Sequence, residues 1–245
     1  MGYHESLTEG RNAVLEAFRS GKTVDRLFVL DGCQDGHVKT ILREAKKQDT
    51  MVQYVKKERL DQLSETKNHQ GVIAYCAACE YAEVSDILEN AKKKGEAPFI
   101  VLLDGIEDPH NLGAIIRTAN QAGAHGVIIP KRRAVGLTAT VARTSAGAVN
   151  YTPVAKVTNL VTVMEDLKKE GMWFVCADMD GEEMYSLNLK GPIGLVIGNE
   201  GEGVSRLVKE HCDMVASIPM KGDIDSLNAS VAMGVLAYEI VRQRR

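Results

Sequence analysis

Residues 98–123 read PFIVLLDGIEDPHNLGAIIRTANQAG, and this stretch predicts the class of the fold. It begins with an unbroken apolar run, which is typical of a parallel strand buried on both faces. A polar turn follows, and residues 111–123 then carry apolar side chains at helical spacing. A strand, a turn and a helix in succession form the repeating unit of parallel α/β sheets.

The same alternation continues to the end of the chain. Each further strand is a short apolar run, and each is followed by a segment with helical spacing. We expect strands at residues 125–130, 151–157, 172–178, 191–198 and 215–220, and helices at residues 138–149, 159–171, 203–212 and 226–245. Residues 98–245 are therefore predicted to form a doubly wound parallel sheet, in which ligands bind beyond the carboxyl ends of the strands.

The chain before residue 98 is predicted to form a separate unit. Residues 1–78 alternate amphipathic helices with short strands, a pattern that suits a compact α/β domain. Residues 79–97 are strongly polar and contain a Lys run followed by a Gly, so we expect a linker with a short helix.

Composition limits the class of protein. Of the 245 residues, 44% are hydrophobic and 26% are charged, which is ordinary for a soluble globular protein. No apolar run approaches the roughly 20 residues that span a bilayer, and the first residues do not read as a secretory signal. The five cysteines include one CxxC, Cys76 and Cys79, without the further ligands that a zinc site needs. We therefore expect a cytoplasmic protein with reduced thiols, no metal and no membrane contact.

The net charge of −3 gives no support to a nucleic-acid partner, so RNA binding would depend on local basic patches. Solvated surfaces and helix ends carry similar patches, so the patches alone decide nothing. The candidates are Lys56, Lys57, Arg59, Lys131, Arg132, Arg133, Arg143, Arg242, Arg244 and Arg245.

Three of the strand-to-helix turns are unusually polar and rich in Gly. In the first, Asp108, His110 or Asn111 can cap the helix that follows. Arg117 then falls within an otherwise apolar helix face, where an unpaired charge would be costly if buried. Arg117 is therefore a surface residue, a member of an ion pair, or a group aimed at a phosphate or hydroxyl of a ligand.

The second turn lies in GLVIGNEGEGVS, residues 194–205, and contains three Gly within six residues. Such a turn can bend sharply and expose backbone N–H and C=O groups to a ligand. It matches neither GxxxxGK[ST] nor GxGxxG, and Glu200 would repel a pyrophosphate, so ATP and NAD are poor candidates. An ordinary Gly-rich turn fits the spacing as well as a binding site does.

The third turn lies in SIPMKGDIDSLNASVAMGVLAYE, residues 217–239, where we expect the first helical turn to carry Ser226, Asn228 and Ser230. Asp225 or Ser226 is enough to cap this helix. The other polar side chains then have no capping role, and they stand at a strand end where a ligand would bind. Capping and a functional role both fit this turn when it is taken alone.

Together these turns resemble a known family. NLGAIIRTA, GLVIGNEGEGVS and SIPMKGDIDSLNASVAMGVLAYE are similar to the three motifs of the SpoU (TrmH-type) RNA ribose 2′-O-methyltransferases of the SPOUT superfamily, across residues 98–245. GRNAVLEA near the start and HQGVIA before residue 78 resemble the N-terminal substrate-binding domain of the RlmB-type subgroup, a small RNA-binding fold.

The resemblance implies S-adenosylmethionine as methyl donor, a ribose 2′-hydroxyl of RNA as acceptor, and a deep trefoil knot in the C-terminal domain. Such knots are nearly absent from other folds, so periodicity alone could not predict one. It also implies cofactor contacts in the loops of the knot. These contacts fall on backbone at Gly198, Ile218 and Leu227, with Asn199, Gly201 and Met220 beside them.

Arg117 matches the catalytic Arg of the family. A base role and an electrostatic role both remain open, although an Arg is normally always protonated. The other polar motif positions are Asn111, Glu200, Ser226 and Asn228, which we expect to orient Arg117, the ribose and the loop. The family also implies a homodimer, and the long apolar last helix fits either an interface or core burial.

The separate N-terminal domain favours a guanosine of 23S rRNA in the peptidyl-transferase region, as free RNA or within a precursor ribosomal particle. The alternative substrate is a guanosine in the D-loop of tRNA; we expect no DNA partner. Two other classes of protein, a nucleotide-binding module without catalysis and a nicotinamide dehydrogenase, are disfavoured. Arg117 and Asn228 argue against the first, and the missing GxGxxG against the second.

Overall fold

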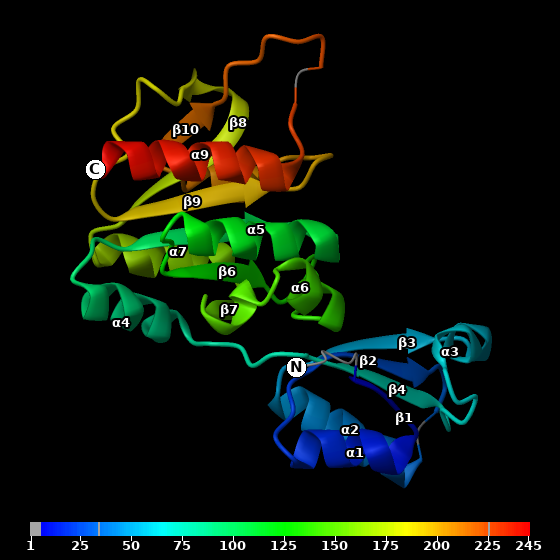
Figure 1. The fold of residues 1–245 in the computed structure, drawn as a ribbon. Helices are drawn as coiled ribbons and strands as arrows, with labels where there is room; N and C mark the ends of the chain where they lie inside the picture. The colour runs from blue at the N-terminus through cyan, green and yellow to red at the C-terminus, as the bar shows by residue number, and fades with distance from the viewer. Residues whose placement is uncertain (1–5, 34, 225) are drawn as a thin grey trace. The chain divides into compact units, whose positions relative to one another are not determined.

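The computed structural model describes residues 6–33, 35–224 and 226–245. The chain folds into two compact units. The first contains the residues up to 80 together with residues 136–139, and the second contains residues 81–135 and 140–245. Figure 1 shows the helices and strands of each unit.

The first unit is a four-stranded mixed sheet with helices on both faces. Its strands lie in the order β1-β4-β2-β3, and only β2 and β3 are parallel. Leu27 and Val29 of β2 pack against the first two helices, while Phe28 packs with Leu60 of the third on the other face. The elements are β1 (Ser6–Glu9), α1 (Arg11–Arg19), β2 (Val24–Leu30), α2 (Gly36–Lys47), β3 (Met51–Val55), α3 (Lys57–Leu63) and β4 (Val72–Cys76).

The second unit is built on a six-stranded sheet in which every pairing is parallel. The strand order is β10-β8-β9-β5-β6-β7. The strands are β5 (Phe99–Asp104), β6 (Gly126–Pro130), β7 (Val154–Val157), β8 (Trp173–Glu183), β9 (Ile193–Gly198) and β10 (Met214–Ser217). The predicted α/β class with a parallel sheet is confirmed, and the knot stays a prediction.

Helices cover both faces of this sheet, as the doubly wound prediction requires (Figure 1). On one face α5 packs against α9. On the other, Ile87 of α4 and Met164 of α7 share a core with Ile100 and Leu102 of β5. The helices are α4 (Val84–Lys94), α5 (Pro109–Gln121), α6 (Ala139–Thr144), α7 (Leu160–Lys169), α8 (Arg206–Glu210) and α9 (Ala229–Gln243), and η1 (Ala148–Asn150) is a single 3₁₀ turn.

The segment predicted to be a linker contains the expected helix, α4. Glu83 and Asp86 form a capping box at its start, and Gly95 ends it in the left-handed conformation with φ of 68°. Ile87 is fully buried in the core of the second unit, so this helix is an integral part of that unit.

The structure differs from the sequence-based assignments at α6 and at β1. The helix expected at residues 138–149 is divided into α6 and η1, because Ala146 and Gly147 both adopt positive φ, 50° and 84°. The strand β1 was not expected, since four residues with two polar side chains carry almost no pattern. Over the described ranges, no helix is long and apolar enough to cross a bilayer.

Candidate active site

Three turns of the second unit converge at the carboxyl edge of the parallel sheet. They follow β5, β9 and β10, and β5 and β9 are direct neighbours, with Asp104 opposite Gly198. Asp104 Oδ2 accepts a hydrogen bond of 2.8 Å from the backbone N–H of Ser205, which fastens the first turn to the second. In Figure 1 the N-terminal end of α9 lies beside the arrowhead of β9. The edge on which the sequence predicted a site therefore carries all three polar turns.

Three side chains, one from each turn, form a hydrogen-bonded cluster. Asn111 Nδ2 donates to Glu200 Oε1. Asn228 Nδ2 donates to Asn111 Oδ1 at 3.0 Å and to Glu200 Oε1 at 3.4 Å. Asn111 is only 8% exposed, so these bonds satisfy a buried amide. The structure thus brings together three of the five predicted catalytic residues.

Ser226 is not part of this cluster. The helix α9 begins at Ala229, with Asn228 as its N-cap, and Asn228 Oδ1 accepts the 3.0 Å bond from the Ser230 N–H. The prediction that Ser226 lies in the first helical turn is therefore wrong, and Ser226, one of the two residues expected as alternatives for the cap, is not the N-cap. Ser226 is an exposed residue of the preceding loop, and Asp225, the other predicted cap, lies outside the described residues. Asn228 takes the cap because its own Oδ1 reaches the N–H two residues on.

Arg117 lies on α5 beside buried Ile116 and Ala119, but its own side chain is exposed. Within the described ranges the guanidinium forms no hydrogen bond or ion pair. The alternative of an ion pair therefore does not apply, and Arg117 is free to bind an anionic group. It lies one helical turn after Gly113, where α6 approaches so closely that an added Cβ would lie 1.8 Å from Thr144 Oγ1.

The turn after β9 is folded back on itself. Asn199 Oδ1 accepts from the backbone N–H groups of Gly201 and Glu202 at 2.9 and 2.7 Å, and Asn199 O accepts from Gly203 N–H. An added Cβ at Gly198 would lie 2.0 Å from the carbonyl carbon of Gly203. Only Gly at position 198 permits this fold, which leaves Gly201 exposed at the tip.

The loop between β10 and α9 presents apolar side chains to solvent. Met220 and Leu227 are 36% and 37% exposed, and Ile224 is 76% exposed, while Ile218 is half-buried. Across the part of the chain that the structure describes, the backbone groups of Met220 and Leu227 make no backbone hydrogen bond. Apolar surface next to free N–H and C=O groups fits an adenosine with a methionine chain. The described residues contain no cluster of three or more metal-ligating side chains.

Exposed arginines flank the first turn. Val135 N–H donates to Ile106 O at 3.0 Å, which holds the loop that carries Arg132 and Arg133 against the β5–α5 turn. Thr144 Oγ1 donates to Pro109 O at 3.3 Å, which holds α6 and the exposed Arg143 against the start of α5. We call Arg132, Arg133 and Arg143 the basic rim.

Sequence reasoning did not single out Asp104 or the basic rim as parts of one site. A polar residue at the last position of a buried apolar strand was the available signal for Asp104. The rim depends on contacts between segments that are distant in sequence, which a basic tripeptide does not reveal.

A parallel sheet with three interlinked turns at its carboxyl edge, joined to a separate small α/β unit, places the chain in the class of two-domain α/β proteins with a candidate ligand site at the strand ends. The sequence model of the SpoU rRNA Methylase family matches residues 98–238. The model of the RNA 2′-O ribose methyltransferase substrate-binding domain matches residues 7–82. The chain belongs to the SpoU rRNA methylase family, and it is an RNA methyltransferase.

Relatives extend over the full length. YacO of Bacillus subtilis, assigned to the TrmH family of tRNA/rRNA methyltransferases, is 49% identical over 237 residues, which cover 96% of this chain and 94% of YacO. The SpoU methyltransferase AviRb from Streptomyces viridochromogenes, solved with AdoMet, has a TM-score of 0.61 at 27% identity, covering 98% of this chain and 90% of its own. An AdoMet-bound rRNA methyltransferase from Sinorhizobium meliloti has a TM-score of 0.61 at 25% identity, covering 97% and 87%.

Proposed function

We propose that this protein transfers a methyl group from S-adenosylmethionine to the ribose 2′-hydroxyl of a guanosine in the peptidyl-transferase region of 23S rRNA. The observation that carries the proposal is the cluster of Asn111, Glu200 and Asn228, which links the three motif turns. Arg117, on the same helix as Asn111, has no partner among the described residues. The acceptor is rRNA in the cytoplasm, free or within a precursor ribosomal particle.

The residues of the folded-back turn and of the β10–α9 loop hold the methyl donor. Gly198, Ile218 and Leu227 contribute backbone, and Asn199, Gly201 and Met220 complete the pocket. When bound, S-adenosylmethionine supplies an electrophilic methyl group on a sulfonium. The exposed apolar surfaces of Met220 and Leu227 and their free backbone groups support this assignment.

Arg117 acts on the acceptor. A ribose hydroxyl is a weak nucleophile until negative charge on its oxygen is stabilised. The guanidinium stays protonated, so it stabilises the developing alkoxide and binds the adjacent phosphate through its planar fork. Its exposure and the lack of a partner among the described residues support this role, because no ion pair there has to be broken first. Ser226, in the exposed loop before Asn228, contacts the ribose.

The basic rim holds the RNA backbone beside the site, and residues up to about 78 select the RNA. A chain of net charge −3 must concentrate its cations where the phosphates bind, and the rim is held against the turn that carries Asn111. The active form is a homodimer. Val231 and Tyr238 are 50% and 52% exposed and lie seven residues apart on α9, so they form an apolar stripe suited to a second copy.

The test is a map of ribose 2′-O-methylation across total RNA from cells with and without the gene. Loss of methylation at one guanosine of 23S rRNA, restored by the purified enzyme with S-adenosylmethionine, is the expected result. Loss in the D-loop of a tRNA would instead establish the second candidate substrate. The family name of the B. subtilis relative includes both tRNA and rRNA. An unchanged map in both RNAs would refute the proposal.

A further inference from the structure

The first unit contains a cleft that the methyl-transfer site does not use. Its volume is about 370 Å³, within the range of small-molecule sites. The cleft lies between the loop after β2, the helix α2 and the strand β3, and Asp31, Gly32, Cys33, Lys39, Leu42 and Tyr54 line it.

The lining has the chemistry of a nucleobase site. Tyr54 is 57% exposed on β3, which is an edge strand, so an aromatic face is available for stacking. Asp31 and Lys39 are both exposed, and among the residues with described positions neither forms an ion pair. A free carboxylate accepts hydrogen bonds from a base and repels a phosphate, whereas a free ammonium donates hydrogen bonds and attracts a phosphate.

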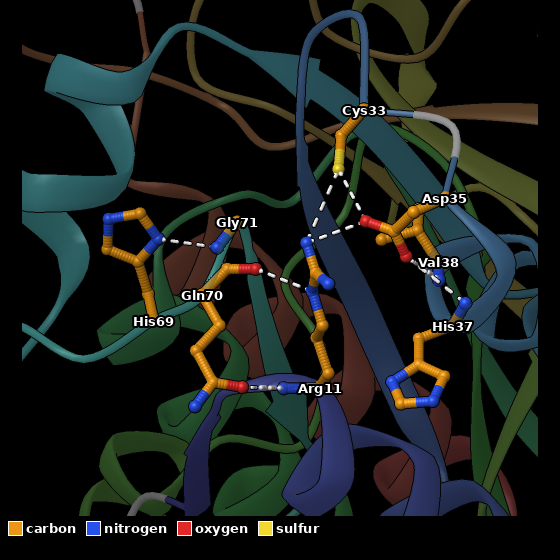
Figure 2. A network of polar contacts seen from close by, with 8 residues as sticks. All are labelled: Arg11, Cys33, Asp35, His37, Val38, His69, Gln70 and Gly71. Carbon is orange, nitrogen blue, oxygen red and sulfur yellow. Dashed lines mark hydrogen bonds and ion pairs between the residues drawn. The ribbon is translucent and has the colours of Figure 1, made fainter.

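A polar network holds one wall of the cleft in place (Figure 2). Arg11 Nη2 of α1 pairs with Asp35 Oδ2 at 2.7 Å, and the same nitrogen donates to Cys33 Sγ at 3.8 Å. Asp35 Oδ1 caps α2 by accepting from His37 and Val38 N–H, both at 3.1 Å, and these bonds hold the pKa of Asp35 below its usual range. The wall that contains Cys33 is therefore positioned before any ligand binds.

Further cations stand at the rim of the cleft. The backbone N–H of Asp31 donates to Val55 O at 2.9 Å, so the loop of the cleft is fastened to the end of β3. Lys56 and Lys57 follow Val55 directly, and both are exposed. A nucleotide whose base enters the cleft would place its phosphates within the field of these ammonium groups.

We propose that this cleft binds one unpaired guanosine of the RNA substrate, at a site separate from the methylated nucleotide. The base stacks on Tyr54, Asp31 accepts from the N1–H and N2–H₂ donors of guanine, and Lys39, Lys56 and Lys57 bind the flanking phosphates. Single-stranded RNA is commonly read by stacking on aromatic side chains and by hydrogen bonds to the exposed base edge. The inference rests on the proposed function, because it concerns how the first unit selects RNA.

The experiment uses the full-length protein and a short fluorescent single-stranded RNA with one guanosine among uridines, compared with the same RNA carrying inosine, which lacks the N2 amino group. We expect tighter binding of the guanosine RNA. Tyr54→Ala should weaken binding roughly tenfold or more, whereas Tyr54→Phe should bind like the wild type. Asp31→Asn should remove the preference for guanosine over inosine. Tyr185→Ala, which removes a 61% exposed tyrosine of the second unit, is the matched control and should change nothing.

A second readout uses Cys33, which lines the cleft and is half-buried. Alkylation of the cysteines by N-ethylmaleimide is measured by mass spectrometry of the cysteine peptides. The guanosine RNA should slow alkylation of Cys33 and leave that of Cys212 unaffected. Wild-type affinity in Tyr54→Ala, together with an unprotected Cys33, would overturn the proposal that the cleft binds a guanosine. Methylation of RNA by the wild type in that case would leave the proposed function standing. Protection of Cys33, together with a methylation map that deletion of the gene leaves unchanged, would overturn the proposed function alone.

Discussion

Arg117→Ala should separate catalysis from stability. The side chain is exposed and has no partner among the described residues, and alanine is at least as good a helix former as arginine. The free energy of unfolding should therefore change by no more than about 0.5 kcal/mol, which corresponds to roughly 1–2 °C in the unfolding temperature. Loss of one group that stabilises a developing oxyanion costs about 2.7–4 kcal/mol, so methyl transfer should fall about 10²- to 10³-fold.

The assay is transfer of a tritiated methyl group from S-adenosylmethionine to the RNA found by methylation mapping, with cofactor affinity measured by calorimetry and unfolding by differential scanning fluorimetry. Cofactor affinity should stay near the wild-type value, because Arg117 is assigned to the acceptor. Arg117→Lys keeps the charge but loses the planar fork, and it should remain well below wild-type activity. Near-full activity in Arg117→Lys would refute the geometric role, and near-full activity in Arg117→Ala would refute any catalytic role.

Three further predictions concern the cap of α9, a buried histidine and the turn after β9. Asn228→Ala should lower the free energy of unfolding by about 1 kcal/mol through loss of the cap, whereas Asn228→Ser keeps the cap and should keep the stability. Both variants should lose at least tenfold in the methyl-transfer assay, and a fully active serine variant would contradict this. Burial holds the pKa of His125 below its ordinary value, so the unfolded chain binds the proton first and stability falls as the pH drops below about 6.5. His125→Asn, whose Oδ1 can still accept from Phe99 N–H, should flatten that part of the unfolding-temperature profile, and an unchanged slope would be the contrary result. Gly198→Ala should abolish cofactor binding in calorimetry because its Cβ meets backbone, while Gly36→Ala, with open space around it, should bind normally.

The apolar strands were predictable because they are buried on both faces. Residues 193–198 of β9 are all buried, and a continuous apolar run of this kind predicts a parallel strand rather than a loop. The polar turns were also predictable, since side chains such as Asn111 and Asn228 stand out at the end of such strands. Sequence alone therefore located the carboxyl edge of the sheet as the place of the candidate site.

Which side chains meet there was not predictable from spacing. Asn111 and Glu200 are 89 residues apart, and Asn228 is a further 28 residues along the chain, so their contacts depend on the strand order. The exposure of Arg117 was equally hidden, because a charged residue next to Ile116 and Ala119 fits either edge of an amphipathic face. The N-cap of α9 was not predictable either, because Asp, Ser and Asn can all cap a helix and only the geometry of the loop selects Asn228.

The choice of Asn at position 228 follows from the two ends of its amide. Its Oδ1 accepts from Ser230 N–H and caps the start of the helix, while its Nδ2 donates toward Asn111 and Glu200. An aspartate could cap the helix but has no donor and would place a second carboxylate beside Glu200, and a serine could cap it but is too short to reach both partners. The residue that starts α9 therefore also fixes the distance between the two other motif turns. Leu227 directly precedes this residue, and Glu200 bonds to it. We therefore expect any shift of the helix start to move the loop proposed to hold the cofactor together with the Glu200 turn, so that a well-formed α9 is a condition for a well-formed candidate site.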